Sequence, residues 1–125
     1  MKEVMAIIRI NRMNETKRAL MAAGFSSMTA TGRVMGRGKG LVDHRVLKAA
    51  DEGNEYAMSL LGEGPRLMSK RILVMTVEDD AVDHAVETIM DANRTGKAGD
   101  GKIFVTECSE VYRVRTGERG PGILQ

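Results

Sequence analysis

The sequence predicts an α+β domain, because a pattern of strand, helix and strand occurs twice along the chain. Apolar runs of strand length begin the two halves, at 4–8 and at 72–77. Each run is followed by apolar residues at helical spacing, most clearly across 82–90. A chain of 125 residues has the size of one domain, so we expect a single domain over 1–125.

The first half contains a strand, a helix and a second strand. After the strand at 4–8, Asn11 and Asn14 can supply side chains that cap a helix. Apolar residues at helical spacing lead to Gly24, which is expected to end this helix because glycine readily adopts a positive φ. Residues 26–35 are again strand-like, with apolar side chains among polar ones.

The second half repeats this order with a stronger pattern. Asp79 and Asp80 follow the strand at 72–77 and can cap the helix predicted over 82–90. Residues 102–106 return as a strand. Two split β-α-β units of this kind form a ferredoxin-like fold, in which an antiparallel sheet carries both helices on one face.

A long connection at about 37–69 separates the two halves and does not fit the repeat. It is rich in glycine and charge, and the good helix formers at 42–58 favour a helix within it. Connections of this length inside a small domain are uncommon and are usually functional loops or disordered segments. We therefore expect a long functional loop, with a surface insertion that has no role as the alternative.

The composition excludes several classes of function. The 19 basic and 17 acidic residues nearly balance, and aromatic residues reach only 3%, so neither a polyanion partner nor base stacking with nucleic acids is expected. Cys108 is the single cysteine, which excludes an internal disulfide, and His44 and His84 provide no zinc-ligand set. The longest apolar run, at 72–75, is too short to cross a membrane, and the N-terminus shows no secretory signal. We expect a soluble cytoplasmic protein without a bound metal.

A glycine-rich segment at 95–105 carries the strongest chemical signal. Residues 96–102 have the Gly-x-x-x-x-Gly-Lys spacing of a phosphate-binding Walker A loop. However, Ile103 follows where that motif needs Ser or Thr, and the loop leads from a helix into a strand rather than the reverse. Glycines still allow backbone N–H groups to converge on an anion, and Lys97 and Lys102 add positive charge. The alternative is an ordinary turn.

Two arginines near the C-terminus form a second candidate anion site. A short strand predicted over 111–114 would place Arg113 and Arg115 on one face, with Tyr112 and Val114 on the other. Adjacent guanidinium groups repel one another unless an anion lies between them, and a polyphosphate fits this role through paired charged hydrogen bonds. A solvated strand edge that carries arginines against aggregation is the alternative.

These segments resemble the PII family of signal-transduction proteins. Residues 95–105 resemble its C-terminal signature and 113–118 resemble the arginine-bearing strand that follows it, while 1–9 and 28–31 are also similar. The resemblance implies a ferredoxin-like subunit that assembles into a compact trimer, with ATP or ADP in each cleft between neighbours. It also implies that 2-oxoglutarate is sensed and that the long connection is a T-loop that grips a target protein.

The resemblance assigns ligand-binding roles to individual residues. The full set is Ile7, Thr29, Gly36, Gly38, Lys39, Lys70, Gly99, Asp100, Gly101, Lys102, Arg113 and Arg115. Residues 99–102 match the phosphate loop, and Arg113 and Arg115 match arginines that reach the phosphates from the neighbouring subunit. Thr29 matches the residue near the ribose, and Ile7 matches a wall of the base pocket.

The entry to the long connection completes this set. Residues 36–39 resemble the glycine-rich start of the T-loop, where the basic Lys39 faces phosphate. Lys70 matches the lysine that meets 2-oxoglutarate. Gly40 stands where the family carries a glutamine that takes part in magnesium and 2-oxoglutarate binding, so the binding of both is left open.

The long connection itself resembles a nitrogenase-associated PII subgroup, in particular the second of its two paralogues. Residues 36–40, 46–48 and 62–67 carry this likeness. It implies a regulator that binds the dinitrogenase component and switches nitrogenase off when fixed nitrogen is plentiful. Relief of this block by 2-oxoglutarate with ATP is implied too, as is either a homotrimer or a mixed complex with the paralogue.

The sequence leaves two other functions open. A general PII regulator would act on another target of nitrogen metabolism, such as an ammonium transporter, an enzyme or a transcription regulator. A slow ATPase would use the same cations on phosphate, but no nucleophile motif or carboxylate pairing of characteristic spacing is present, so no catalytic residue is assigned.

Overall fold

The computed structural model describes residues 1–36 and 67–125. Four strands form one antiparallel sheet in the order β2-β3-β1-β4. Their bounds are Lys2–Arg9 for β1, Thr29–Gly36 for β2, Met68–Val77 for β3 and Lys102–Glu107 for β4. In each β-α-β unit the two strands are separated by a strand of the other unit, which confirms the predicted ferredoxin-like arrangement.

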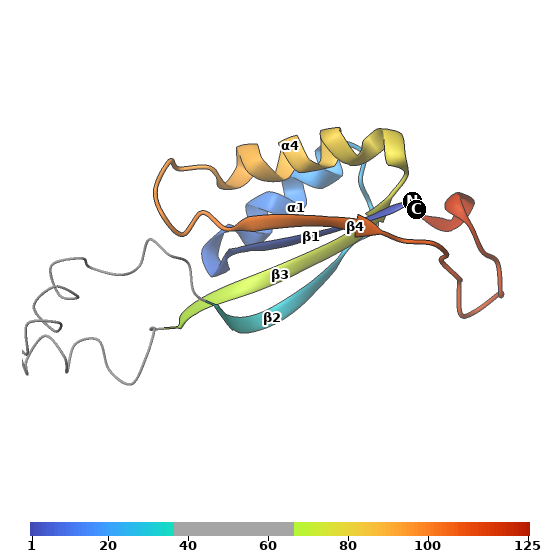
Figure 1. Cartoon of the computed structure of the whole chain (residues 1–125), viewed down its shortest axis with the longest axis horizontal. Helices are drawn as coiled ribbons and strands as arrows, with labels where there is room; N and C mark the ends of the chain where they lie inside the picture. Colours follow the sequence, from blue (N-terminus) through green and yellow to red (C-terminus); the bar gives the residue numbers. More distant parts are fainter. Residues whose placement is uncertain (37–66) are drawn as a thin grey trace, which may run out of the picture.

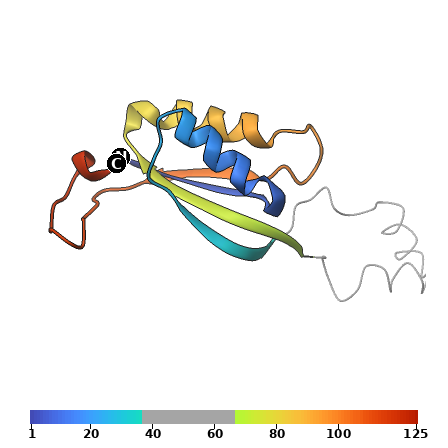
Figure 2. The same ribbon diagram turned by 180° about the vertical axis from the view of Figure 1, so that it is seen from behind.

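Two helices cover one face of this sheet, and no helix of the described part covers the other face (Figures 1 and 2). Helix α1 spans Met13–Ala22 and helix α4 spans Val82–Asn93. Each helix is preceded by a short 3-10 turn, η1 at Ile10–Arg12 and η3 at Asp79–Ala81, and a third, η4, spans Pro121–Ile123 near the C-terminus. Within the described ranges, no helix is long and apolar enough to span a membrane.

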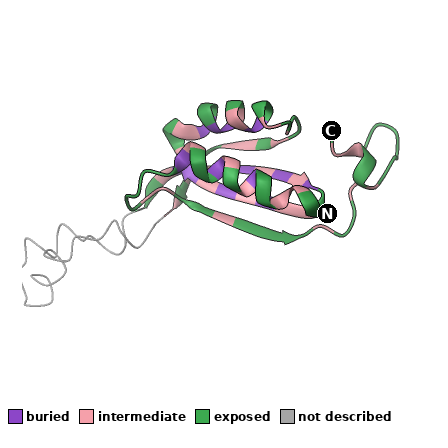
Figure 3. Ribbon diagram, turned by 90° about the horizontal axis from the view of Figure 1, so that it is seen from above, coloured by how far each residue is buried: buried purple, intermediate pink, exposed green. Residues whose placement is uncertain are grey.

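The hydrophobic core lies between the helices and the sheet (Figure 3). Alternate residues of β1 and β3 point into it, because successive side chains of a strand face opposite sides. The pairing of Ala6 with Leu73, and of Val4 with Met75, brings these side chains together. The buried apolar residues are Val4, Ala6, Ile8, Met13, Leu20, Leu73, Met75, Val77, Ala85 and Ile89.

The face of the sheet away from the helices is also apolar. We call it the open face; its apolar residues are Met5, Ile7, Ile72, Val74 and Phe104, which are cross-strand partners of one another. In the single chain these side chains are only partly buried, and Phe104 is 47% exposed. The open face therefore presents a contiguous apolar surface on two central strands and one edge strand.

The helix starts differ from the sequence prediction. Asn11 lies within η1 and Asn14 within α1, and the residue before α1 is Arg12, with no side-chain cap among the described residues. Asp79 lies within η3, where its carboxylate pairs with the N-terminal ammonium group at 3.1 Å. The predicted caps are therefore wrong, because a 3-10 turn at each helix start moves these side chains off the capping position. Gly24 does follow α1 with φ of 97°.

The strand bounds also shift. Strand β3 begins at Met68, which shortens the predicted loop of 37–69 by two residues at its end, and β2 starts at Thr29 rather than at residue 26. The rest of the loop prediction, with the helix expected at 42–58, lies outside the described residues.

The strand predicted over 111–114 is wrong. Only Tyr112 forms an isolated bridge, with Arg119, and the chain turns back between them. The N–H of Arg113 donates to the carbonyl of Glu118 at 2.7 Å, and the N–H of Gly117 donates to the carbonyl of Arg113 at 2.8 Å. Gly117 has φ of 76°, a conformation that glycine adopts readily, so a tight turn forms where the alternation of apolar and basic residues had predicted a strand.

We expect the core to carry most of the stability of the fold, and two adjacent residues of α1 test this. Leu20 is fully buried, whereas Met21 is 64% exposed. Truncating a buried leucine loses transfer energy and leaves a cavity, so Leu20→Ala should lower the free energy of unfolding by about 2–5 kcal/mol. Met21→Ala should change it by less than about 0.5 kcal/mol. Urea unfolding at equal protein concentration measures both; equal losses would contradict this assignment of the core.

Candidate functional site

A glycine loop connects α4 to β4 and packs on the end of β1. We define it as residues 95–101. Gly96, Gly99 and Gly101 have φ of 80°, 97° and 112°, which favours glycine at all three positions. At Gly101 a Cβ would overlap the carbonyl oxygen of Ile7, so any side chain there would displace backbone. The backbones of the loop and of β1 are therefore in direct contact.

The acidic residue of the loop is bound by the loop itself. The carboxylate of Asp100 accepts hydrogen bonds from the Thr95 N–H at 2.7 Å, the Thr95 hydroxyl at 2.5 Å and the Gly96 N–H at 3.0 Å. The Thr95 bonds, together with the Arg9 guanidinium, hold the pKa of Asp100 far below its usual range. Two backbone N–H groups expected to be available for an external anion thus already hold an internal carboxylate.

Two cations from neighbouring strands contact the same loop. Arg9 ends β1 and pairs across the sheet with Lys70 of β3. The Arg9 guanidinium lies 2.5 Å from an Asp100 carboxylate oxygen and donates to the Ala98 carbonyl at 3.0 Å. The Lys70 ammonium donates to the Gly99 carbonyl at 2.7 Å, and Lys70 is only 8% exposed. Burial, and then the charge of Arg9, lower the pKa of Lys70.

Most of the predicted ligand residues of the described part gather at this end of the sheet. Ile7 is the cross-strand partner of Lys102, so both lie on the open face. Gly36 ends β2 beside Lys70, where a Cβ would lie 3.6 Å from the Lys70 side chain. Together with 99–101, these residues form one cluster from four different segments of the chain. Gly38 and Lys39 lie outside the described residues.

Three predicted residues lie elsewhere. Thr29 begins β2, at the end of that strand opposite to Gly36, and pairs with Val74. Arg113 and Arg115 lie in the C-terminal turn, which projects from the opposite end of the sheet to the glycine loop (Figure 1). Within one chain, the arginines and the loop cannot contact the same small ligand.

The C-terminal turn also changes the relation between its two arginines. Arg113 forms an ion pair with Glu118 across the turn at 2.9 Å. The pKa of Glu118 is lowered, mainly by a hydrogen bond with the Thr116 hydroxyl and then by the charge of Arg113. Arg115 is exposed within the turn. The predicted common strand face for Arg113 and Arg115 is therefore wrong, because the backbone turns between 113 and 117 instead of extending.

Arg9 was missed by the sequence prediction. Arg9 ends an apolar strand and lies two residues after Ile7, so strand alternation could have placed it on the same face as Ile7. No local pattern indicated its contact with Asp100, which lies 91 residues further along the chain.

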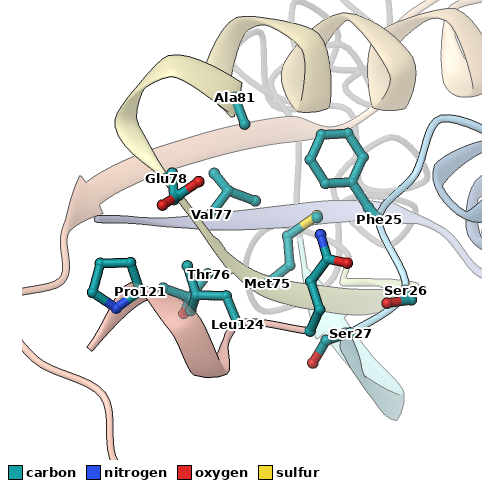
Figure 4. A pocket seen from close by; sticks show the side chains of 11 residues that line it. Phe25, Ser26, Ser27, Met75, Thr76, Val77, Glu78, Ala81, Pro121 and Leu124 are labelled. Carbon is teal, nitrogen blue, oxygen red and sulfur yellow. The ribbon is translucent and has the colours of Figure 1, made fainter. Parts of the chain in front are cut away.

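Two hollows flank the sheet. A groove of about 390 Å³ lies between α4 and β4 on the helix side. Its lining combines apolar side chains with Asn93, Arg94 and residues 100–102. A smaller hollow of about 100 Å³ lies at the far end of β3, between Phe25 and the C-terminal residues Pro121 and Leu124 (Figure 4). None of the predicted ligand residues lines this smaller hollow. In the described residues, no group of three or more His, Cys, Asp and Glu side chains could hold a metal ion.

Comparison with known proteins gives a consistent result over the whole chain. The family model described as "Nitrogen regulatory protein P-II" matches residues 1–118. The "Nitrogen fixation nifHD region GlnB-like protein 2" of Methanothermobacter marburgensis is 43% identical over 99% of this chain and 100% of its own length. The "Nitrogen fixation nifHD1 region GlnB-like protein 2" of Methanosarcina barkeri is 42% identical, with 96% of each chain covered. The "Nitrogen regulatory protein P-II 2" of Methanothermobacter thermautotrophicus is 42% identical over 96% of this chain and 94% of its own length.

We expect the contact between Gly101 and β1 to tolerate no side chain, and Gly96 provides a matched control. Both residues have positive φ, but a Cβ at Gly96 meets no atom within 4 Å. Gly96→Ala should therefore lower the free energy of unfolding by about 1–2 kcal/mol, the cost of a left-handed residue. Gly101→Ala adds a backbone clash and should be clearly more destabilising. Urea unfolding of both variants measures the difference; equal destabilisation would contradict the close approach.

Proposed function

Because this chain belongs to the nitrogen regulatory protein P-II family, we propose that it is a regulator that binds ATP or ADP between the subunits of a trimer. The observation that carries this proposal is the separation of the two cationic clusters. The glycine loop, which leads into β4 at Lys102, lies at one end of the sheet. The C-terminal turn, which contains Arg113 and Arg115, lies at the other end (Figure 1). A polyphosphate that needs both clusters requires two copies of the chain.

The open face supports self-association. Neither helix covers this side of the sheet (Figure 2). Its apolar side chains are only partly buried, and Phe104 in particular is half-exposed. Contiguous apolar surface of this kind is characteristic of protein–protein contacts. In the proposed trimer the open faces of three copies pack together, or those of this chain and a paralogue in a mixed complex. This packing brings the C-terminal turn of one copy to the glycine loop of its neighbour.

The proposed nucleotide site combines elements of two subunits. Gly99, Gly101 and Lys102 of one copy receive the phosphates, with Gly36, Gly38 and Lys39 at the entry of the loop; Ile7 contacts the base. The neighbouring copy contributes Thr29 near the ribose and Arg113 and Arg115 at the phosphates. Arg113 must exchange Glu118 for the phosphate, and charged hydrogen bonds to a polyphosphate favour this exchange.

The proposed target is the dinitrogenase component of nitrogenase. Two relatives that match nearly the full chain carry names that refer to the nifHD region of nitrogen fixation. We propose that the long loop binds dinitrogenase in the ADP state in the cytoplasm and releases it when ATP and 2-oxoglutarate bind. Lys70, buried beside the glycine loop, is the proposed contact for 2-oxoglutarate.

A general nitrogen regulator is the second candidate. The relative from Methanothermobacter thermautotrophicus is as similar as the nifHD-region protein of Methanosarcina barkeri, and its name refers to no nitrogenase region. On this alternative, the same nucleotide switch acts on another protein of nitrogen metabolism.

Mixed trimers test whether the nucleotide site is shared between subunits. Charged hydrogen bonds contribute roughly 1.5–3 kcal/mol, so Lys102→Ala and Arg113→Ala should each weaken ATP binding by about tenfold or more. Trimers assembled from both variants contain an interface in which the intact lysine of one copy meets the intact arginine of the other. We expect calorimetry to recover high-affinity sites in this mixture, at less than one per chain.

Arg119→Ala serves as the control, since Arg119 lies at the base of the same turn and belongs to neither cluster. It should bind ATP as the wild type does. If the mixture of Lys102→Ala and Arg113→Ala binds ATP no better than either variant alone, the site does not combine the two clusters of neighbouring chains.

A pull-down from nitrogen-fixing cells tests the target and the switch. With this protein as bait, dinitrogenase should be recovered in ADP and released by ATP with 2-oxoglutarate. Lys70→Ala should require a higher 2-oxoglutarate concentration for release, whereas Lys17→Ala on α1 should not. Release of the Lys70 variant at the wild-type concentration would contradict the role of Lys70. Recovery of another nitrogen-metabolism protein in place of dinitrogenase would favour the second candidate.

A further inference from the structure

Arg9 and Lys70 form a pair of like charges at the end of the central strands. They are cross-strand partners, so their side chains emerge side by side on the open face. Like charges in this position repel one another. Burial has the largest effect in lowering the pKa of Lys70, and the charge of Arg9 lowers it further. Both residues therefore need negative or dipolar partners, and the glycine loop supplies them.

The loop offers successive oxygen atoms to this pair. Arg9 contacts the carbonyl of Ala98 and the carboxylate of Asp100, and Lys70 contacts the carbonyl of Gly99 between them. Asp100 in turn holds the N–H groups of Thr95 and Gly96 at the start of the loop. One guanidinium thereby connects the end of β1 to both ends of the glycine loop.

We propose that Arg9 is the positioning residue of the glycine loop and acts through Asp100. The inference rests on the proposed function, in which this loop receives the nucleotide phosphates. Arg9 does not contact the nucleotide; it holds Ala98 and Asp100 so that the backbone between Gly99 and Lys102 has its binding geometry before the ligand arrives. A preformed loop loses less conformational freedom on binding, which increases affinity.

Substitution of Asp100 tests this proposal, because positioning and simple electrostatics predict opposite changes in ATP affinity. If only net charge mattered, removing a carboxylate beside a phosphate site would tighten ATP binding. If Asp100 acts as the link between Arg9 and the loop, Asp100→Asn loses the charged contact to Arg9 and frees the loop. Positioning therefore predicts weaker ATP binding from a substitution that simple electrostatics predicts to strengthen it.

The experiment measures ATP affinity by calorimetry for the full-length protein and five variants, one of which is a matched control. We expect Arg9→Gln and Asp100→Asn each to weaken ATP binding by about tenfold, in line with the loss of a charged hydrogen bond. The double variant should be little worse than either single one, because both remove the same link. Arg9→Lys keeps the charge without the forked geometry and should recover part of the affinity.

Arg12→Gln is the matched control. Arg12 lies three residues further on, and its guanidinium contacts the Ala92 carbonyl and Glu15 rather than the loop. The Arg12→Gln substitution removes the same charge as Arg9→Gln. It should therefore lower ATP affinity only by the long-range electrostatic effect of that charge. Amide exchange of Gly96, whose N–H donates to Asp100, reports loop order directly and should accelerate in Arg9→Gln but not in Arg12→Gln.

The outcomes separate the two proposals. Unchanged or tighter ATP binding by Asp100→Asn, with normal binding by the wild type, overturns the positioning role and leaves the proposed nucleotide site intact. An equal loss of ATP affinity in Arg9→Gln and Arg12→Gln would mean that Arg9 acts only through its charge. That result likewise overturns the positioning role of Arg9. Absence of ATP binding by the wild-type trimer overturns the proposed function and this inference with it.

Discussion

The side-chain alternation of β1, which lies between β3 and β4, is the constraint on which both the core and the candidate site depend. Within 4–8 the even-numbered residues fill the core beneath the helices. Ile7 and Arg9 point to the other side, toward the open face and the glycine loop. A slip of one residue in this strand would exchange the two sets, so the energy that buries the core also sets the register of the site.

The glycine loop holds an internal anion, the carboxylate of Asp100. The Asp100 carboxylate satisfies the N–H groups of Thr95 and Gly96, and it balances the Arg9 guanidinium. Lys70 adds a third fixed point at Gly99. Such internal bonding holds the backbone of a glycine-rich segment, which would otherwise lose much conformational entropy on ordering, in one conformation before any ligand binds.

In the proposed trimer, the distance between the glycine loop and the C-terminal turn links subunit association to nucleotide binding. A nucleotide that contacts Lys102 in one copy and Arg113 in another contributes its binding energy to their association, and by linkage the association raises the affinity for the nucleotide. On this proposal, packing of the apolar open face and nucleotide binding at the composite site belong to one equilibrium. A target protein that distinguishes ADP from ATP must in turn change the affinity for each nucleotide.

Much of the fold follows from local pattern, because strand alternation and helical periodicity act between residues that are near in sequence. The two β-α-β units and the positive φ at Gly24 were predictable for this reason, and the contiguous signature at 95–105 identified the family. Local pattern failed at the helix starts and at 111–114, where a 3-10 turn or a glycine turn competes with the regular element. Tertiary structure alone decided which distant groups are in contact. Arg9 contacts Asp100, 91 residues away, because the register between β1 and β4 brings the glycine loop to the end of β1. No periodicity in the sequence encodes a contact between segments so far apart.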